Sequence, residues 1–407
     1  MTKSEALVYK LCTKSFLSLW SYPNPTGKKG KELCDILVVC QPDVIIFSVK
    51  EIEFKDTGDK VGWERWRKKA IEESCSQIHG AERWINSNSN IINQSGETGL
   101  LFPNVSNRKV HRIAVALGGK GDVALHFGDF GKGFVHVFDE ISLEAIMNEL
   151  DTISDFVSYL SRKEDFYYQG KQTLLFGEED LLALYLANNR NFPAEPTDIV
   201  LDNDLWKEFQ ETPQIKGKKE LDKISYIWDE IIEEIHQTFL DSNFIIGNSF
   251  STELSDIEKA VRIMAREDRY ARRRLAISLT DFLQTAKIQK IKSRINPNSS
   301  SMDDVIYVFQ TSNYDADREA NFNELQLRCV VARGLNLTKT KVLGILVEFS
   351  NIVEGSATSL CFLEIKDWTK NWQEKMELVQ SEMRYFVSPS VKKYSEDAYT
   401  KEYPEFK

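Results

Sequence analysis

Two short apolar runs, each with a charged residue at one end, constrain this chain more than any other feature of its sequence. Residues 33–40 form the first run and contain Asp35, and residues 44–49 form the second, directly before Lys50. Both runs are rich in Val and Ile, which is typical of strands buried on both faces. Because residues 41–43 are Gln-Pro-Asp, a turn-forming sequence, we predict a hairpin that places Asp35 beside Lys50.

Helical patterns lie on both sides of this hairpin. Apolar residues at 3- and 4-residue spacing predict helices over residues 4–20 and 63–85. The Asn- and Ser-rich residues 86–109 predict a loop. Beyond it, the pattern predicts strands at residues 110–117, 123–127 and 134–138, then helices at 142–163 and 178–188.

The remainder of the chain divides into a helical part and a mixed part. The pattern over residues 201–296 is mostly helical, and the Pro-Asn-Ser-rich residues 297–301 predict a hinge. Strands are predicted at residues 305–309, 342–349 and 360–365, and helices at 316–333 and 367–385. We therefore expect an α/β protein in three parts: an N-terminal domain (1–200), a helical middle region (201–296) and a small C-terminal α/β module (297–407).

The hairpin has the charges that phosphodiester hydrolysis needs. Such a reaction uses a hard cation held by two or three oxygen ligands, and a group that orients the attacking water. An Asp on one strand and a carboxylate and Lys two residues apart on the next can supply both, because alternate side chains of a strand share a face. Asp35 and Lys50 fit two of these positions, although a structural ion pair would explain them as well.

This segment resembles the core of the PD-(D/E)XK nucleases, the restriction-endonuclease-like superfamily. Residues 32–35 (Glu-Leu-Cys-Asp), residues 44–50 (Val-Ile-Ile-Phe-Ser-Val-Lys) and the Trp-rich residues 63–84 also resemble a group of uncharacterised bacterial proteins. The nuclease resemblance implies a restriction-endonuclease-like N-terminal core and an endonuclease that uses Mg²⁺ or Mn²⁺. It implies that Asp35 binds the metal and that Lys50 orients water and stabilises developing charge.

The sequence departs from the family pattern at Ser48, where Asp or Glu is expected. The resemblance offers two candidates for the replacement metal ligand. One is Glu64, on the following helix about 14 residues after Lys50, and the other is Glu32. It also implies a further ligand at Glu5 and a catalytic role for Gln77, while Ser48 itself could position a water. Each has a structural alternative: Glu5 could cap its helix and Gln77 could bond buried backbone. Because Glu64 and Gln77 are roughly 20 Å apart along a continuous helix, we do not expect both to reach one metal.

Composition limits the other classes of function. The net charge is −10, which argues against a protein that coats nucleic acid through its overall field but leaves room for a local basic channel. Six scattered Cys residues with no Cys-x-x-Cys pair predict buried thiols instead of a zinc site. No apolar stretch is long enough to span a membrane, and the first residues do not resemble a secretory signal, so we expect a cytoplasmic protein.

Two other motifs have a structural and a functional interpretation. The glycine-rich residues 118–121 and 128–133 lie between predicted strands, which favours hairpin turns over phosphate-binding loops. Residues 262–274 contain six Arg, and the default expectation is a solvated helix with ion pairs along it. Contact with a phosphate backbone is the functional alternative.

Two functions from different classes follow. The first is a metal-dependent nuclease acting on nucleic acid, with DNA favoured over RNA, in a setting such as bacterial antiviral defence. The second is an inactive nuclease fold that binds nucleic acid or protein, which the Ser at position 48 favours. A protein partner or a homo-oligomer is compatible with either, through residues 201–407.

Overall fold

The computed structural model divides the chain into two compact units, residues 1–215 and 216–407. The structure describes all residues except 56–59, 120–124, 171, 175–176, 195–197, 201–203, 242–244, 247–248, 251–253, 290, 314–316, 350–355, 388, 390–391 and 405–407. The expected boundary near residue 200 thus falls 15 residues before the division, and the expected helical region and C-terminal module lie in one unit.

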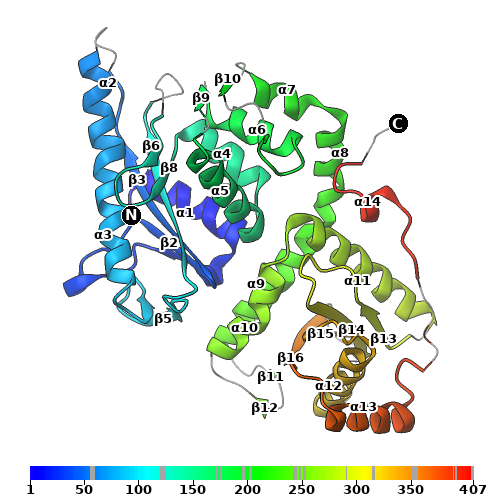
Figure 1. The fold of residues 1–407 in the computed structure, drawn as a ribbon. Helices are drawn as coiled ribbons and strands as arrows, with labels where there is room; N and C mark the ends of the chain where they lie inside the picture. Colours follow the sequence, from blue (N-terminus) through cyan, green and yellow to red (C-terminus); the bar gives the residue numbers. More distant parts are fainter. Residues whose placement is uncertain are drawn as a thin grey trace. The chain divides into compact units, whose positions relative to one another are not determined.

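A six-stranded mixed sheet forms the centre of the first unit (Figure 1). Its strands, in spatial order, are β1 (Ser21–Pro23), β2 (Ile36–Cys40), β3 (Asp43–Glu51), β6 (Lys109–Leu117), β8 (Phe134–Phe138) and β7 (Gly128–Asp129). Strands β1, β2 and β3 are antiparallel neighbours, whereas β3, β6 and β8 run parallel. The predicted hairpin of two buried strands is therefore confirmed.

Helices cover both faces of this sheet (Figure 1). One face packs against the helix that precedes β1 and against the two helices that follow β8. For example, Phe47 on β3 contacts Phe156 on the second of those two helices. The other face packs against the long helix that follows β3, where Arg112 on β6 bonds Glu82. The helices of the unit are α1 (Lys3–Phe16), α2 (Lys60–Arg67), a π-helical turn (Lys68–Glu72), α3 (Glu73–Ile85), α4 (Glu140–Glu149), α5 (Ile153–Tyr168), α6 (Glu178–Ala187) and α7 (Leu205–Glu211).

Small elements complete the first unit, and most predictions for it are confirmed. A two-stranded sheet of β4 (Asn90–Ile92) and β5 (Thr98–Leu101) lies within the expected loop, and β9 (Gln172–Leu174) pairs with β10 (Asp198–Val200). Residues 128–133 form the expected β7–β8 hairpin turn. The strand predicted at 123–127 lies partly outside the described residues, and residues 125–127 are not a strand.

The second unit is a four-stranded sheet with helices on both faces. Its strand order is β13 (Ser293–Asn296), β14 (Val305–Asn313), β15 (Lys341–Phe349) and β16 (Ser356–Glu364). The central pair β14–β15 is parallel, and α12 (Arg318–Leu335) connects the two strands. The other helices are α8 (Pro213–Asp222), α9 (Tyr226–Asp241), α10 (Leu254–Ala265), α11 (Arg269–Gln289), α13 (Lys370–Met383) and α14 (Asp397–Thr400), and a short pair joins β11 (Ile245–Ile246) to β12 (Ser249–Phe250).

The helical residues 216–289 belong with this sheet because they cover one of its two faces. Tyr307 on β14 packs against Trp228 on α9, and Phe309 packs against Phe282 on α11. The opposite face, with Ile306 and Val308, packs against α12. The expected hinge at residues 297–301 is held inside this unit, since the buried Glu267 carboxylate accepts hydrogen bonds from that segment.

The expectation for the Arg-rich segment was wrong for three of its members. Arg269, Arg272 and Arg273 are 1%, 1% and 0% exposed, so α11 is not solvated there. Arg269 and Arg272 both pair with Asp229 on α9, at 2.9 and 2.5 Å. Arg262 forms the predicted type of pair along its own helix, with Glu258.

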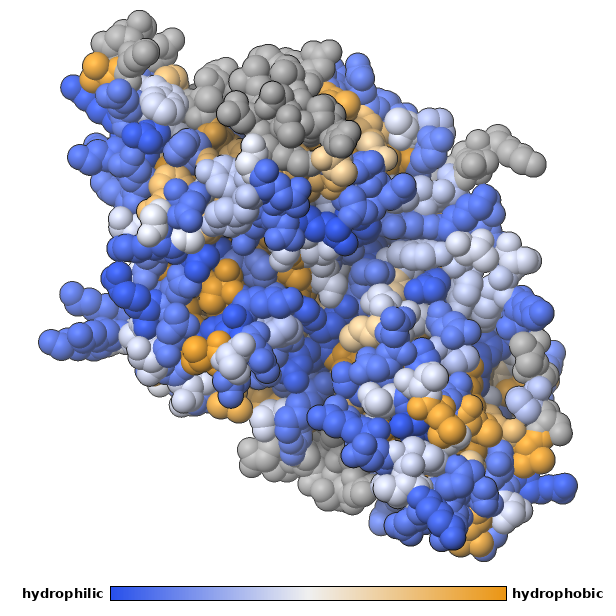
Figure 2. Space-filling model, in the orientation of Figure 1, coloured by the Kyte–Doolittle hydropathy of each residue, from blue (hydrophilic) through white to orange (hydrophobic). Residues whose placement is uncertain are grey.

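Surface and thiol properties agree with the composition. On the face shown in Figure 2, hydrophilic side chains dominate and hydrophobic ones gather in small areas. All six Cys are buried and free, as predicted. No helix among the described residues is both long and apolar enough to cross a membrane.

Candidate active site

The β2–β3 hairpin brings Asp35 to the end of β3. Ile36 pairs with Phe47, so Asp35, one residue before β2, lies across from Ser48 if this register continues. Its carboxylate accepts a hydrogen bond from the backbone N–H of Val49 (2.5 Å), and its carbonyl accepts one from Asn24 (2.8 Å). Asp35 is only 7% exposed. Backbone N–H groups therefore hold Asp35 at two points: Val49 on β3 holds its side chain, and Asn24, directly after β1, holds its carbonyl.

The environment of Asp35 opposes its ionisation. Burial raises the pKa of this carboxyl from 3.8 to about 6, although the Val49 hydrogen bond and the charge of Lys50 lower it. The neighbouring Glu32 carboxyl adds to the increase. Strongly perturbed carboxyls of this kind concentrate at functional sites. Asp35, Lys50 and Glu32 thus lie close enough together for the charges of Lys50 and Glu32 to affect the pKa of Asp35.

Ser48 and Gln77 form a second contact beside this group. Alternation along β3 places the Ser48 and Lys50 side chains on one face of the sheet, the face covered by α3. The Ser48 hydroxyl, in a residue 1% exposed, donates to Gln77 Oε1 at 2.9 Å. Gln77 itself is exposed and does not belong to the buried stripe of α3. It hydrogen-bonds a buried side chain, whereas the structural alternative was a backbone contact.

Two of the other candidate ligands have different roles in the structure. Glu5 accepts from the backbone N–H of Thr2 at 2.8 Å in a capping box at the start of α1, which matches its structural alternative. Glu64 is exposed on α2, two residues before the buried Trp66. The π-helical turn between α2 and α3 changes the helical phase that separates Glu64 from Gln77. Within the described part of the chain, no three His, Cys, Asp or Glu side chains are arranged to hold a metal ion.

Sequence patterns missed two contacts at the end of β3. The Ser4 hydroxyl on α1 donates to the carboxylate of Glu51. The Trp66 indole donates to the carbonyl of Ile52 at 2.7 Å. These contacts attach α1 and α2 to the strand that carries Lys50. Only the polar Ser4 in an otherwise apolar helix stripe could have signalled the first one.

A second buried polar cluster lies on the opposite face of the sheet and was also missed. Asp43, at the start of β3, lies 2.8 Å from His111 Nε2 on β6. His136 Nε2 on β8 lies 3.0 Å from Glu164 on α5. Burial and the charge of Lys163 hold the pKa of His136 well below its ordinary value of 6.5. His136 is therefore neutral at neutral pH and its contact with Glu164 is a hydrogen bond.

Comparison with known proteins adds no relative. No family model, curated protein or solved structure matches this chain. The arrangement of the side chains is therefore the basis for assigning a function.

Proposed function

We propose that the first unit is a metal-dependent nuclease that hydrolyses phosphodiester bonds of nucleic acid at Asp35 and Lys50. The observation that carries this proposal is the carboxyl of Asp35, buried against Val49 N–H with Glu32 and Lys50 close enough to affect its pKa. A buried carboxyl with a raised pKa is destabilising unless it binds something. A cation bound to the ionised carboxylate would offset the cost of burying its charge.

The connectivity of the first unit supports the same proposal. Helix α1 leads into the antiparallel strands β1, β2 and β3, then α3 leads into β6, which runs parallel to β3. A restriction-endonuclease-like core is expected to have a mixed sheet with its acidic residue and its Lys at the meeting ends of two antiparallel strands. Asp35 and Lys50 occupy such ends.

The oxygen donors of the site fit Mg²⁺ or Mn²⁺. Mg²⁺ commonly binds one or two carboxylates and keeps several waters, so it does not require a complete protein cage. Asp35 and Glu32 would hold the metal, and when bound it would supply Lewis acidity toward the scissile phosphate. The raised pKa of Asp35 beside Glu32 suits this, since a cation would offset the charges of the two carboxylates.

The side chains around Asp35 each have a separate role in this proposal. Lys50 orients the attacking water and stabilises the charge that develops on the phosphate. The Val49 N–H fixes the Asp35 carboxylate, while Gln77 holds the Ser48 hydroxyl between strand and helix. Glu5 and Glu64 have no part in it.

A second candidate function has one specific observation in its favour. Ser48 stands where the family pattern has a carboxylate, and its hydroxyl already binds Gln77. An inactive nuclease fold that only binds nucleic acid or protein would tolerate this replacement. Such a protein has no need of a metal, so metal binding separates the two candidates.

Titration with Mn²⁺ followed by electron paramagnetic resonance tests the proposal. Wild-type protein should bind Mn²⁺, and Asp35→Asn should lose at least about tenfold in affinity, because a metal ligand is removed while the Val49 hydrogen bond can persist. Asp303→Asn, which removes an exposed carboxylate of the other unit, should bind like wild type. Equal Mn²⁺ affinity of wild type and Asp35→Asn would contradict the proposal, and no binding by wild type would favour the inactive fold.

A further inference from the structure

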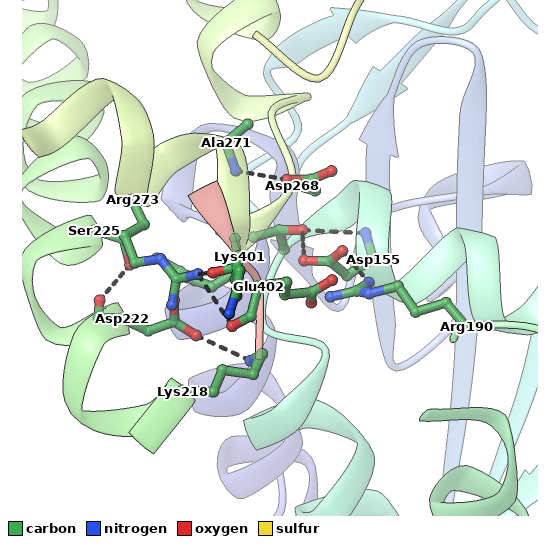
Figure 3. Close-up of polar contacts among 12 residues, drawn as sticks. Asp155, Arg190, Lys218, Asp222, Ser225, Asp268, Ala271, Arg273, Lys401 and Glu402 are labelled. Carbon is green, nitrogen blue, oxygen red and sulfur yellow. Dashed lines mark hydrogen bonds and ion pairs between the residues drawn. The ribbon is translucent and has the colours of Figure 1, made fainter. Parts of the chain in front are cut away.

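One face of α11 in the second unit is covered by the end of the chain. Tyr270, Arg273 and Arg274 share this face, since they are three and four residues apart. The segment that crosses it, residues 392–404, is called the C-terminal strap below. Arg273 Nη2 donates to the carbonyls of Lys401 (2.6 Å) and Glu402 (3.0 Å), as Figure 3 shows.

The partners that hold this face are mostly neutral backbone carbonyls. The Tyr270 hydroxyl donates to the carbonyl of Tyr399 at 2.9 Å. Arg274 donates to the carbonyls of Asn298 (3.2 Å) and Ser300 (3.3 Å). A guanidinium forms its strongest hydrogen bonds with carboxylate or phosphate oxygens. Neutral carbonyls therefore occupy positions where an anion would bind better.

Arg273 is incompletely satisfied although it is completely buried. It is 0% exposed, and its Nε and Nη1 atoms have no hydrogen-bond partner among the described atoms. Nη1 lies 3.2 Å from Asp222 Oδ1, an ion pair without hydrogen-bond geometry, and Asp222 also accepts from Lys218 at 2.9 Å (Figure 3). A buried donor without a partner is costly, so the Nε of Arg273 remains able to bind an acceptor.

The position of these cations on α11 is itself unfavourable without an anion. Residues 269–274 occupy the first two turns of the helix, where the macrodipole favours negative charge. Asp229 balances Arg269 and Arg272. The helix terminus proper is already capped, because Asp268 accepts from Ala271 N–H at 2.7 Å. On the side-chain face, Asp222 pairs with Arg273, whereas the hydrogen bonds of Arg274 go to neutral carbonyls.

The C-terminal strap is held by a few side-chain contacts. Tyr399 bonds Ser299 at 2.7 Å and stacks on Tyr394 with ring centroids 4.4 Å apart. Tyr394 donates to Asp281 at 3.0 Å, and Lys392 bonds the same carboxylate. The described strap contains no strand, and its single helix, α14, has four residues. Displacing the described strap therefore breaks side-chain contacts but no strand pairing.

We infer that the Tyr270–Arg273–Arg274 face of α11 binds a phosphate-bearing anion, and that the C-terminal strap covers this site when the ligand is absent. The guanidinium groups of Arg273 and Arg274 lie 4.9 and 4.8 Å from the centroid of the Tyr270 ring, so both are near one position that a phosphate would occupy. The phosphate could belong to a free nucleotide or to a nucleic-acid chain. This inference concerns the second unit alone and does not depend on the nuclease proposal.

Hydrogen–deuterium exchange of the full-length protein tests whether a phosphate ligand displaces the strap. Inorganic pyrophosphate, ATP and a single-stranded oligonucleotide are added separately in metal-free buffer, each against sodium chloride at the same ionic strength. Exchange at the amides of residues 392–404 should increase with pyrophosphate and with at least one of the other two. A response to ATP identifies a free nucleotide, and a response to the oligonucleotide alone identifies a nucleic-acid chain.

Affinity measurements with variants complete the test. Tyr399→Ala weakens the strap and should increase the affinity for the responding ligand about tenfold, because less of the protein is closed. Arg274→Gln should reduce affinity about tenfold or more, since a charge-assisted hydrogen bond is lost. Lys287→Gln removes an exposed positive charge from the same helix and should bind like wild type. Unchanged strap exchange with all three ligands, or equal effects of Arg274→Gln and Lys287→Gln, would overturn the inference.

Discussion

The contact between Ser48 and Gln77 provides a prediction whose size depends on which partner is removed. Ser48 is 1% exposed and Gln77 is exposed, and a single 2.9 Å hydrogen bond joins them. Gln77→Ala leaves a buried hydroxyl without its acceptor, which should lower the free energy of unfolding of the first unit by about 1–2 kcal/mol. Ser48→Ala removes the buried hydroxyl and leaves the exposed amide to water, so it should cost less than about 1 kcal/mol.

Urea denaturation followed by tryptophan fluorescence measures this difference. In the double variant the two effects should not add, because both single changes remove one shared hydrogen bond. The expected order of stability is wild type, Ser48→Ala, then Gln77→Ala, with the double variant close to Ser48→Ala. A larger loss for Ser48→Ala than for Gln77→Ala would refute the reasoning, since the buried hydroxyl would then not be the group that needs a partner.

Three further predictions concern stability. Gly344→Ala should destabilise the second unit by about 1–3 kcal/mol in urea, because the added Cβ would lie 2.6 Å from Cys329 Sγ; an increase in stability would contradict the packing. Asp229→Asn should cost about 3 kcal/mol by the same assay, since the buried Arg272 loses its carboxylate, and a loss below about 1 kcal/mol would refute this. The folded-state pKa of His136 is lowered, so the unfolded chain binds the proton more tightly and stability should decrease as pH falls below about 6.5; His136→Gln should reduce this slope in urea midpoints measured across that range.

Much of the fold of this chain could be predicted because its strands have strong residue preferences. The run of Val and Ile in β2 and β3, and the five residues of β8, are buried strands in both sequence and structure. The helix expected at 142–163 is two helices, because Thr152 caps a new one by accepting from Asp155 N–H at 3.1 Å. Thr followed by an acidic residue at the third position is a recognisable N-cap signal. The division into two units was less predictable. The helices of residues 216–289 join the second sheet through tertiary packing, which leaves no local pattern in the sequence.

The site was predictable only where chain connectivity determines it. A hairpin necessarily brings Asp35 near Lys50, and Glu32 is close to Asp35 in sequence. Glu64 and Gln77 depend on helical phase, which the π-helical turn at residues 68–72 changes without a clear sequence signal. The partners of Arg272 come from a different helix, so the charge pattern of α11 could not reveal its burial.

The most direct test of the account is cleavage of nucleic acid by wild-type protein beside Lys50→Ala. Supercoiled plasmid, linear DNA and single-stranded RNA are incubated with Mg²⁺ or Mn²⁺, with Lys10→Ala as a control that removes an exposed Lys of α1. The account predicts metal-dependent cutting that Lys10→Ala retains and that Lys50→Ala reduces by about a hundredfold or more. Equal cutting by wild type and Lys50→Ala, or no cutting of any substrate by wild type, would contradict it.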